Sequence, residues 1–150
     1  MTETPPTALH LNLAPHPEGG WYRRHFTSPH TIEHPAPGST RPTATMIHYL
    51  LGPGERSRWH TVASDEIWLW QRGGRLNLYT SNPGPGPTVE HHHLLGPDIE
   101  RGEQLHVHVP AGHWQRAEPA DDTEVLLACL VTPGFDFADF TLLADAPDEP

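Results

Sequence analysis

The sequence predicts an all-β fold built of two sheets, a jelly roll or a small barrel. Short strand-like segments follow one another at regular spacing, and turn residues separate them. The 150 residues include 18 prolines and 13 glycines, which favour short elements joined by turns over long helices. Neither an internal repeat nor a break in composition divides the chain, so residues 1–150 are expected to form a single domain.

Each expected element follows from its local pattern. Residues 1–8 and 145–150 are expected to be loose ends, and a short helical element is expected before Leu13. Residues 16–20 form a tight turn, and the proline-rich residues 28–43 form a loop. Branched, aromatic or alternating apolar residues predict strands at 21–27, 44–51, 66–71, 75–80, 88–95, 104–109, 114–117 and 125–131.

Charge and composition exclude several classes of function. The formal charge is −10, from 19 acidic residues against nine basic ones, and all nine are arginine. Without lysine the chain forms no Schiff base, which excludes a covalent pyridoxal phosphate site. A surface this acidic disfavours nucleic acid as a partner. Cys129 is the single cysteine, so neither a disulfide within the chain nor a cysteine-based zinc finger is possible.

The sequence pattern carries no signal for export or for membrane insertion. The N-terminus lacks the basic start and apolar run of a signal peptide. No apolar run approaches the ~18 residues that a membrane span needs. We therefore expect a soluble cytoplasmic protein with no membrane partner.

One segment combines a histidine and a glutamate at a recognisable spacing. Between Gly54 and Gly73 stand His60 and, six residues later, Glu66. This pattern resembles the first sequence motif of the cupins, with one departure. Val62 stands where the motif has its second histidine.

A second motif and several shorter ones extend the resemblance. Pro110 and Gly112 fit the second cupin motif, but Gln115 stands in place of its histidine. The chain is similar to the Cupin 5 family (DUF985) over residues 9–142. This implies an RmlC-like jelly-roll barrel (a double-stranded β-helix) and a homodimer. The segments that carry the similarity are residues 16–20, 57–60, 64–68, 109–115 and 132–140.

The resemblance implies two chemistries for the centre of the barrel. In a typical cupin, histidines and a glutamate hold a divalent metal, and the matching residues here are His60, Glu66 and Gln115. One imidazole, one carboxylate and one amide would hold Fe, Mn, Ni or Zn only weakly. The cofactor is therefore either one weakly bound divalent metal or none. Alternatively, His60 and Glu66 form a hydrogen-bonded pair without metal.

Proton transfer needs only these residues and no metal. RmlC-type sugar epimerases share the barrel and use a histidine polarised by a carboxylate, a role that His60 and Glu66 can fill. Arg58 is expected on the face of His60 to bind a carboxylate or phosphate, and Tyr49 or Tyr22 to act as the acid. An isomerase, epimerase or lyase acting on a small molecule is the leading hypothesis. A non-catalytic ligand-binding or sensor protein, and a metal-dependent dioxygenase or decarboxylase, are the alternatives.

Strand alternation indicates which other side chains share the pocket. Trp68 and Trp70 follow Glu66 at even spacing, so all three are expected to point inward and form an aromatic wall for a flat ring or sugar. Equal spacing makes His48 a possible inward group and a replacement ligand. The run His91, His92 and His93 is expected at the surface or at a dimer edge, where it binds metal only adventitiously.

Overall fold

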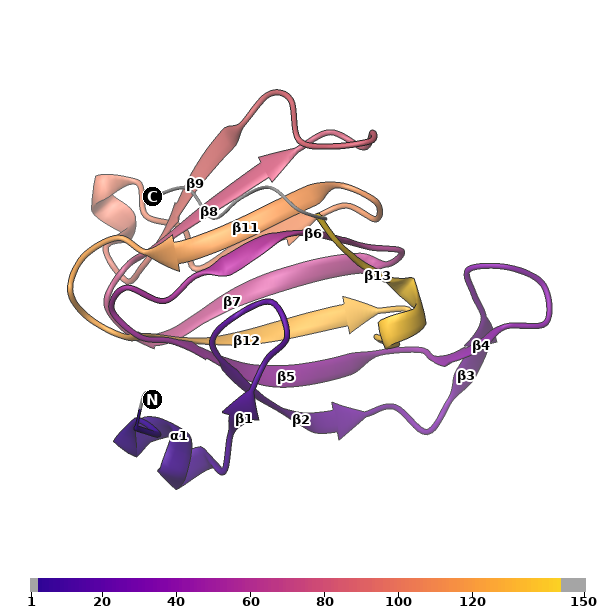
Figure 1. The fold of residues 1–150 in the computed structure, drawn as a ribbon, viewed down its shortest axis with the longest axis horizontal. Helices are drawn as coiled ribbons and strands as arrows, with labels where there is room; N and C mark the ends of the chain where they lie inside the picture. Colours follow the sequence, from indigo (N-terminus) through magenta and orange to yellow (C-terminus); the bar gives the residue numbers. More distant parts are fainter. Residues whose placement is uncertain (1–2, 144–150) are drawn as a thin grey trace.

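Two antiparallel sheets form the body of the protein, as the computed structural model in Figure 1 shows for residues 3–143. A third, two-stranded sheet pairs β3 (Thr31–Glu33) with β4 (Thr40–Pro42) and stands away from the other two. The six-stranded sheet has the order β1 (Ala14–Pro15), β2 (Trp21–Thr27), β5 (Thr45–Leu51), β12 (Val125–Thr132), β7 (Asp65–Gly73), β10 (His106–Val109). The five-stranded sheet has the order β13 (Phe140–Leu142), β6 (Ser57–Val62), β11 (Trp114–Pro119), β8 (Leu76–Ser81), β9 (His91–Leu95).

The core lies between the two larger sheets and follows the alternation of their strands. On β12, Val125, Leu127 and Cys129 are buried in one cluster with Leu76 and Leu78 of β8. Burying such side chains contributes roughly 1.5–3 kcal/mol each. The predicted jelly roll, with one short helix, is confirmed.

The short helix α1 (Pro6–Leu11) covers part of the outer face of the six-stranded sheet. Pro6 occupies the first turn, where a missing N–H costs nothing, and Asn12 ends the helix in the left-handed conformation at φ 58°. Residues 1–8 are therefore not wholly a loose end, because Thr7 and Ala8 belong to this helix and are buried. The other expected loose end, residues 145–150, lies outside the described residues.

The expected loop at residues 28–43 is instead the hairpin of β3 and β4. Backbone pairing between Ile32 and Arg41 creates it despite the prolines. Two 3₁₀ turns, Ile99–Arg101 and Phe137–Asp139, complete the described elements. Among residues 3–143, no helix has the length and apolar character that a membrane crossing requires.

Candidate active site

A small cavity opens between the two sheets at the predicted histidine and glutamate. Its polar wall holds His16, Glu18, His60, Glu66 and Cys129. Its volume is about 30 Å³, enough for roughly one or two water molecules. Aliphatic and aromatic side chains supply the rest of the lining: Tyr22, Ile47, Val62, Val131, Phe135 and Phe140.

The turn at residues 16–20 carries Glu18 into this cavity. The peptide N–H of Arg58 donates to the carbonyl oxygen of Glu18, which fastens the turn to β6 two residues before His60. Gly19 has a φ of 113°, and a Cβ there would collide with the backbone carbonyl of Arg56. Glycine is therefore required for this close approach.

His60 and Glu18 form a buried ion pair. Nδ1 of His60 lies 2.7 Å from the carbonyl oxygen of Arg58, and Nε2 lies 2.9 Å from Oε2 of Glu18. Because both partners are acceptors, each ring nitrogen donates, and the ring is an imidazolium. Burial alone would lower the pKa of His60, but the charge and hydrogen bond of Glu18 outweigh it and the pKa is raised. Burial would likewise raise the pKa of Glu18, yet His60 holds it below its ordinary value.

Glu66 is the second carboxyl group of the cavity, and its environment is different. Its side chain is buried, and no arginine lies among the described residues that line the cavity. Burial raises the pKa of Glu66 to about 7, against the opposing effect of the His60 charge. Glu66 therefore holds or releases a proton near neutral pH, whereas Glu18 stays ionised.

Gln115 orients Glu66 through a chain of two hydrogen bonds. The indole N–H of Trp68 donates to Oε1 of Gln115 at 2.6 Å, and Nε2 of Gln115 donates to Oε1 of Glu66 at 2.9 Å. Because an indole nitrogen only donates, it fixes which end of the amide is oxygen. Gln115 therefore presents its N–H to Glu66.

We expect Gln115→Leu to raise the pKa of Glu66 above about 7, since the hydrogen bond that lowers it is lost. The stranded Trp68 N–H should also destabilise the fold by about 1–3 kcal/mol. Carboxyl carbon NMR titration and urea denaturation measure the two effects. Adding Trp68→Phe should recover part of the lost stability, because no indole donor is then left unpaired. An unchanged Glu66 pKa in the single variant would contradict the role of Gln115.

The expected metal ligands His60, Glu66 and Gln115 do not present three lone pairs to one point. Both nitrogens of His60 donate, and the amide oxygen of Gln115 accepts from Trp68. Among the described residues, no group of three His, Cys, Asp or Glu side chains has the geometry of a metal site. A metal would have to displace Glu18 and turn the Gln115 amide, so this arrangement does not fit one.

Two of the expected pocket residues, Arg58 and His48, lie outside the cavity lining. The pairing of β6 with β11 slips between His60 and Ser57, which breaks the alternation that would place Arg58 beside His60. Arg58 is exposed and donates to the carbonyl oxygen of Pro17. His48 lies on the opposite face of β5 from Ile47 and Tyr49, stacked on His25 with ring centroids 4.1 Å apart.

Of the aromatic residues expected in the pocket, some pack in the core and one lines the cavity. Trp68 and Tyr49 are fully buried, and the Tyr49 hydroxyl donates to the carbonyl oxygen of Gly19. Trp70 is half-buried against the core, and its indole N–H donates to the carbonyl oxygen of Gly74. None of these three lines the cavity, whereas Tyr22 does.

The three consecutive histidines lie on β9, an edge strand of the five-stranded sheet. His92 contacts Oδ1 of Asn77 at 2.6 Å, and His93 contacts the Thr80 hydroxyl at 3.1 Å. His91 and His92 are exposed, as expected for surface residues.

A cluster of phenylalanine rings forms part of the cavity lining. Phe135 and Phe140 line it, and Phe137 packs against both, with centroids 4.9 and 6.0 Å away. The segment that carries them is fixed to the β3–β4 hairpin, because Arg41 binds both carboxylate oxygens of Asp139 at 2.8 and 2.9 Å. The aromatic part of the lining therefore lies on an anchored backbone.

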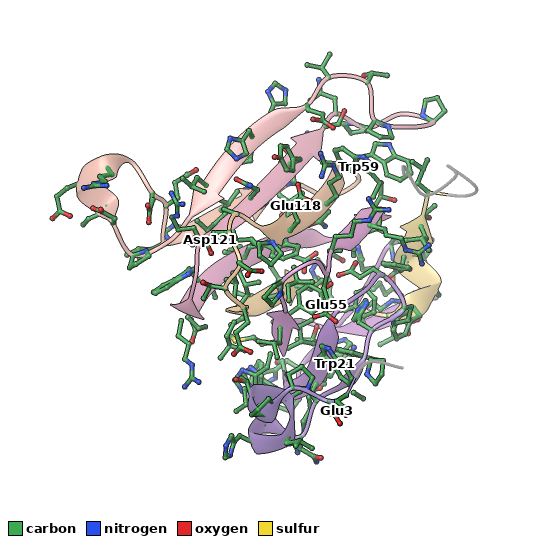
Figure 2. All side chains as sticks on the ribbon, turned by 60° about the vertical axis from the view of Figure 1, so that its left-hand side comes forward. Glu3, Trp21, Glu55, Trp59, Glu118 and Asp121 are labelled. Carbon is green, nitrogen blue, oxygen red and sulfur yellow. The ribbon has the colours of Figure 1, made fainter. Side chains whose placement is uncertain are left out.

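A larger hollow of about 510 Å³ lies on the surface, lined by Gly54, Glu55, Arg56, Glu118 and Pro119. In Figure 2, Glu55 and Glu118 can be followed on this side of the molecule. The Glu55 carboxylate accepts from the Trp21 indole and from the Gly52 N–H. The Glu55 carboxylate therefore stabilises the fold. The buried cavity with His60 and Glu66 remains the better candidate for an active site.

Sequence reasoning missed Glu18 and His16 as site residues. Both belong to residues 16–20, one of the segments that carry the family resemblance, whose glycines predict only a turn. His16 accepts the Glu18 N–H at Nδ1, and burial lowers its pKa, so it is neutral. The signal that could have identified Glu18 is its place between a proline and two glycines. A tight turn of this kind can hold a single side chain in a fixed position.

Comparison with known proteins agrees with this architecture. The family model described as Cupin superfamily (DUF985) matches residues 7–143. An uncharacterized protein of Saccharomyces cerevisiae is 30% identical over 161 residues, covering 95% of this chain and 78% of its own. A hypothetical protein from Leishmania major (32% identity, TM-score 0.81) covers 89% of this chain and 83% of its own. A protein from Shewanella oneidensis (32%, TM-score 0.82) covers 95% and 85%.

Proposed function

Because the chain belongs to the Cupin 5 family (DUF985) of the cupin superfamily, we propose that it is a small-molecule enzyme that transfers protons within its barrel. The reaction class is isomerisation, epimerisation or elimination. One observation carries the proposal. A buried carboxyl group without a basic partner, Glu66, shares a cavity with the ion pair of His60 and Glu18.

The geometry favours Glu66 over His60 as the proton acceptor. Both nitrogens of His60 already donate hydrogen bonds, so the ring has no lone pair with which to accept a proton. Glu66 accepts hydrogen bonds from Gln115 and Cys129, and its pKa of about 7 lets it take up or release a proton near neutral pH. Glu66 is thus the general base, and the ion pair of His60 and Glu18 forms the polar wall beside it.

Hydrogen exchange at carbon tests this proposal without knowledge of the product. Small carbonyl compounds and sugars are incubated with the protein in D₂O, and NMR records deuterium incorporation next to the carbonyl. We expect at least one compound to exchange, with the rate rising as the pH passes about 7. Glu66→Gln should slow this exchange by about a hundredfold or more, while the matched surface variant Glu33→Gln leaves it unchanged.

The same experiment separates the enzyme from a ligand-binding or sensor protein. A compound that binds in the cavity and carries an acidic C–H, yet exchanges no faster than in buffer, would overturn the proposal. Exchange that survives in Glu66→Gln would do so as well. Metal analysis of protein purified without a tag or nickel resin accompanies the assay. Exchange that requires about one metal per chain would replace the metal-free mechanism.

A further inference from the structure

The described residues that line the cavity leave no unpaired cation for a buried anion. The positive charge of His60 is already paired with Glu18 at 2.9 Å. The chain has no lysine, and the described lining residues include no arginine. Of the two arginines beside the phenylalanine segment, Arg41 is paired with Asp139. Arg24 is exposed, donates to the carbonyl oxygen of Phe135 and lies outside the cavity lining.

Glu66 makes the cavity still less suitable for an anion. In its ionised form it repels a phosphate or carboxylate, and in its neutral form it provides no compensating charge. Burying an unpaired anion beside it therefore costs free energy in either state. A hydroxyl or carbonyl oxygen avoids this cost, since it can share a hydrogen bond with a carboxyl group.

The aromatic lining of the cavity is suited to a ring. The His16 and Tyr22 rings meet edge to face with centroids 4.4 Å apart, and Phe140 lies 5.3 Å from the His60 ring. Aromatic rings pack favourably against other flat rings. The present volume of about 30 Å³ is too small for one, so side chains of the lining must move to admit it.

We propose that this cavity takes an uncharged compound bearing a ring and a hydroxyl or carbonyl oxygen, and that it rejects phosphate- and carboxylate-bearing analogues. The ring lies among Tyr22, Phe135 and Phe140, and the oxygen lies beside Glu66. This inference deepens the proposed function, because it names the substrate class for the same cavity.

Three probes of nearly equal shape test the inference on the full chain: benzyl alcohol, benzoate and benzylammonium. Methyl NMR signals of Ile47, Val62 and Val131 report entry into the cavity, because these side chains line it. We expect benzyl alcohol to shift these signals at millimolar concentration and benzoate to bind at least about tenfold more weakly. Val131→Phe, which fills the cavity, should abolish the binding. If Val131→Phe does not fold, Val62→Phe, which fills the same cavity, is used instead.

Each other outcome overturns the inference. Equal or tighter binding of benzoate would show that the cavity accepts anions, and tighter binding of benzylammonium would show that it selects cations. No shift with any probe would show that the cavity admits no ring. These results are independent of deuterium exchange. If benzyl alcohol binds selectively but no substrate exchanges, the proposed function fails while the ligand class stands.

Discussion

Glu66→Gln is expected to stabilise the protein by about 3 kcal/mol above neutral pH, and this gain should vanish near pH 4.5. The pKa of Glu66 is about 7 in the folded protein against 4.5 as its ordinary value. Each unit of difference corresponds to about 1.36 kcal/mol. The folded state therefore holds the proton more tightly than the unfolded chain does.

The direction of the pH dependence follows from this difference. Below about pH 4.5 the carboxyl group is protonated in both states and costs nothing. As the pH rises to about 7, the unfolded chain loses its proton first, so wild-type stability falls; above that range the loss is constant. Glutamine carries no charge at any pH, so the Glu66→Gln variant does not lose stability in this way.

Urea denaturation at about pH 8 and about pH 5 measures the effect. Glu33→Gln, on the exposed strand β3, is the matched control and should change stability by less than about 0.5 kcal/mol at both pH values. If Glu66→Gln changed stability equally at both pH values, the buried carboxyl group would not have the raised pKa on which the proposed mechanism depends.

Glu18→Ala is expected to destabilise the protein by about 3 kcal/mol, because it leaves the His60 imidazolium buried without its counter-charge. The pKa of His60 should then fall below its ordinary value, since burial remains and the Glu18 charge is gone. Histidine NMR titration measures the pKa, and urea denaturation measures the stability.

This effect has a defined pH window. The raised pKa of His60 contributes stability that is fully present below about 6.5 and is lost as the pH rises through the folded pKa. The lowered pKa of Glu18 contributes stability that is present above about 4.5 and is lost below it. The cost of Glu18→Ala should therefore be largest between these values.

A double-mutant cycle with His60→Ala provides the control. If the two residues interact as a buried pair, the double variant should lose much less stability than the two single losses combined. Strictly additive losses would show that Glu18 acts on the fold by another route.

Local pattern was sufficient for most strands. The unbroken apolar run of β12 and the alternation of β8 each predict a strand, because burial on two faces or one face leaves that signature. Pattern failed at the β3–β4 hairpin, where proline content predicted a loop. It also failed for Arg58, because a register slip in β6 is set by the partner strand β11.

The sequence by itself determined the all-β class, the family resemblance and the absence of lysine chemistry. The resemblance also implied that Glu66 and Gln115 lie close together. Only the tertiary structure decided which atoms face one another. It pairs His60 with Glu18. It also sets the orientation of the Gln115 amide through a hydrogen bond from Trp68, 47 positions away in the chain. Proton affinity and hydrogen-bond direction depend on burial and on distant neighbours, which no local pattern records.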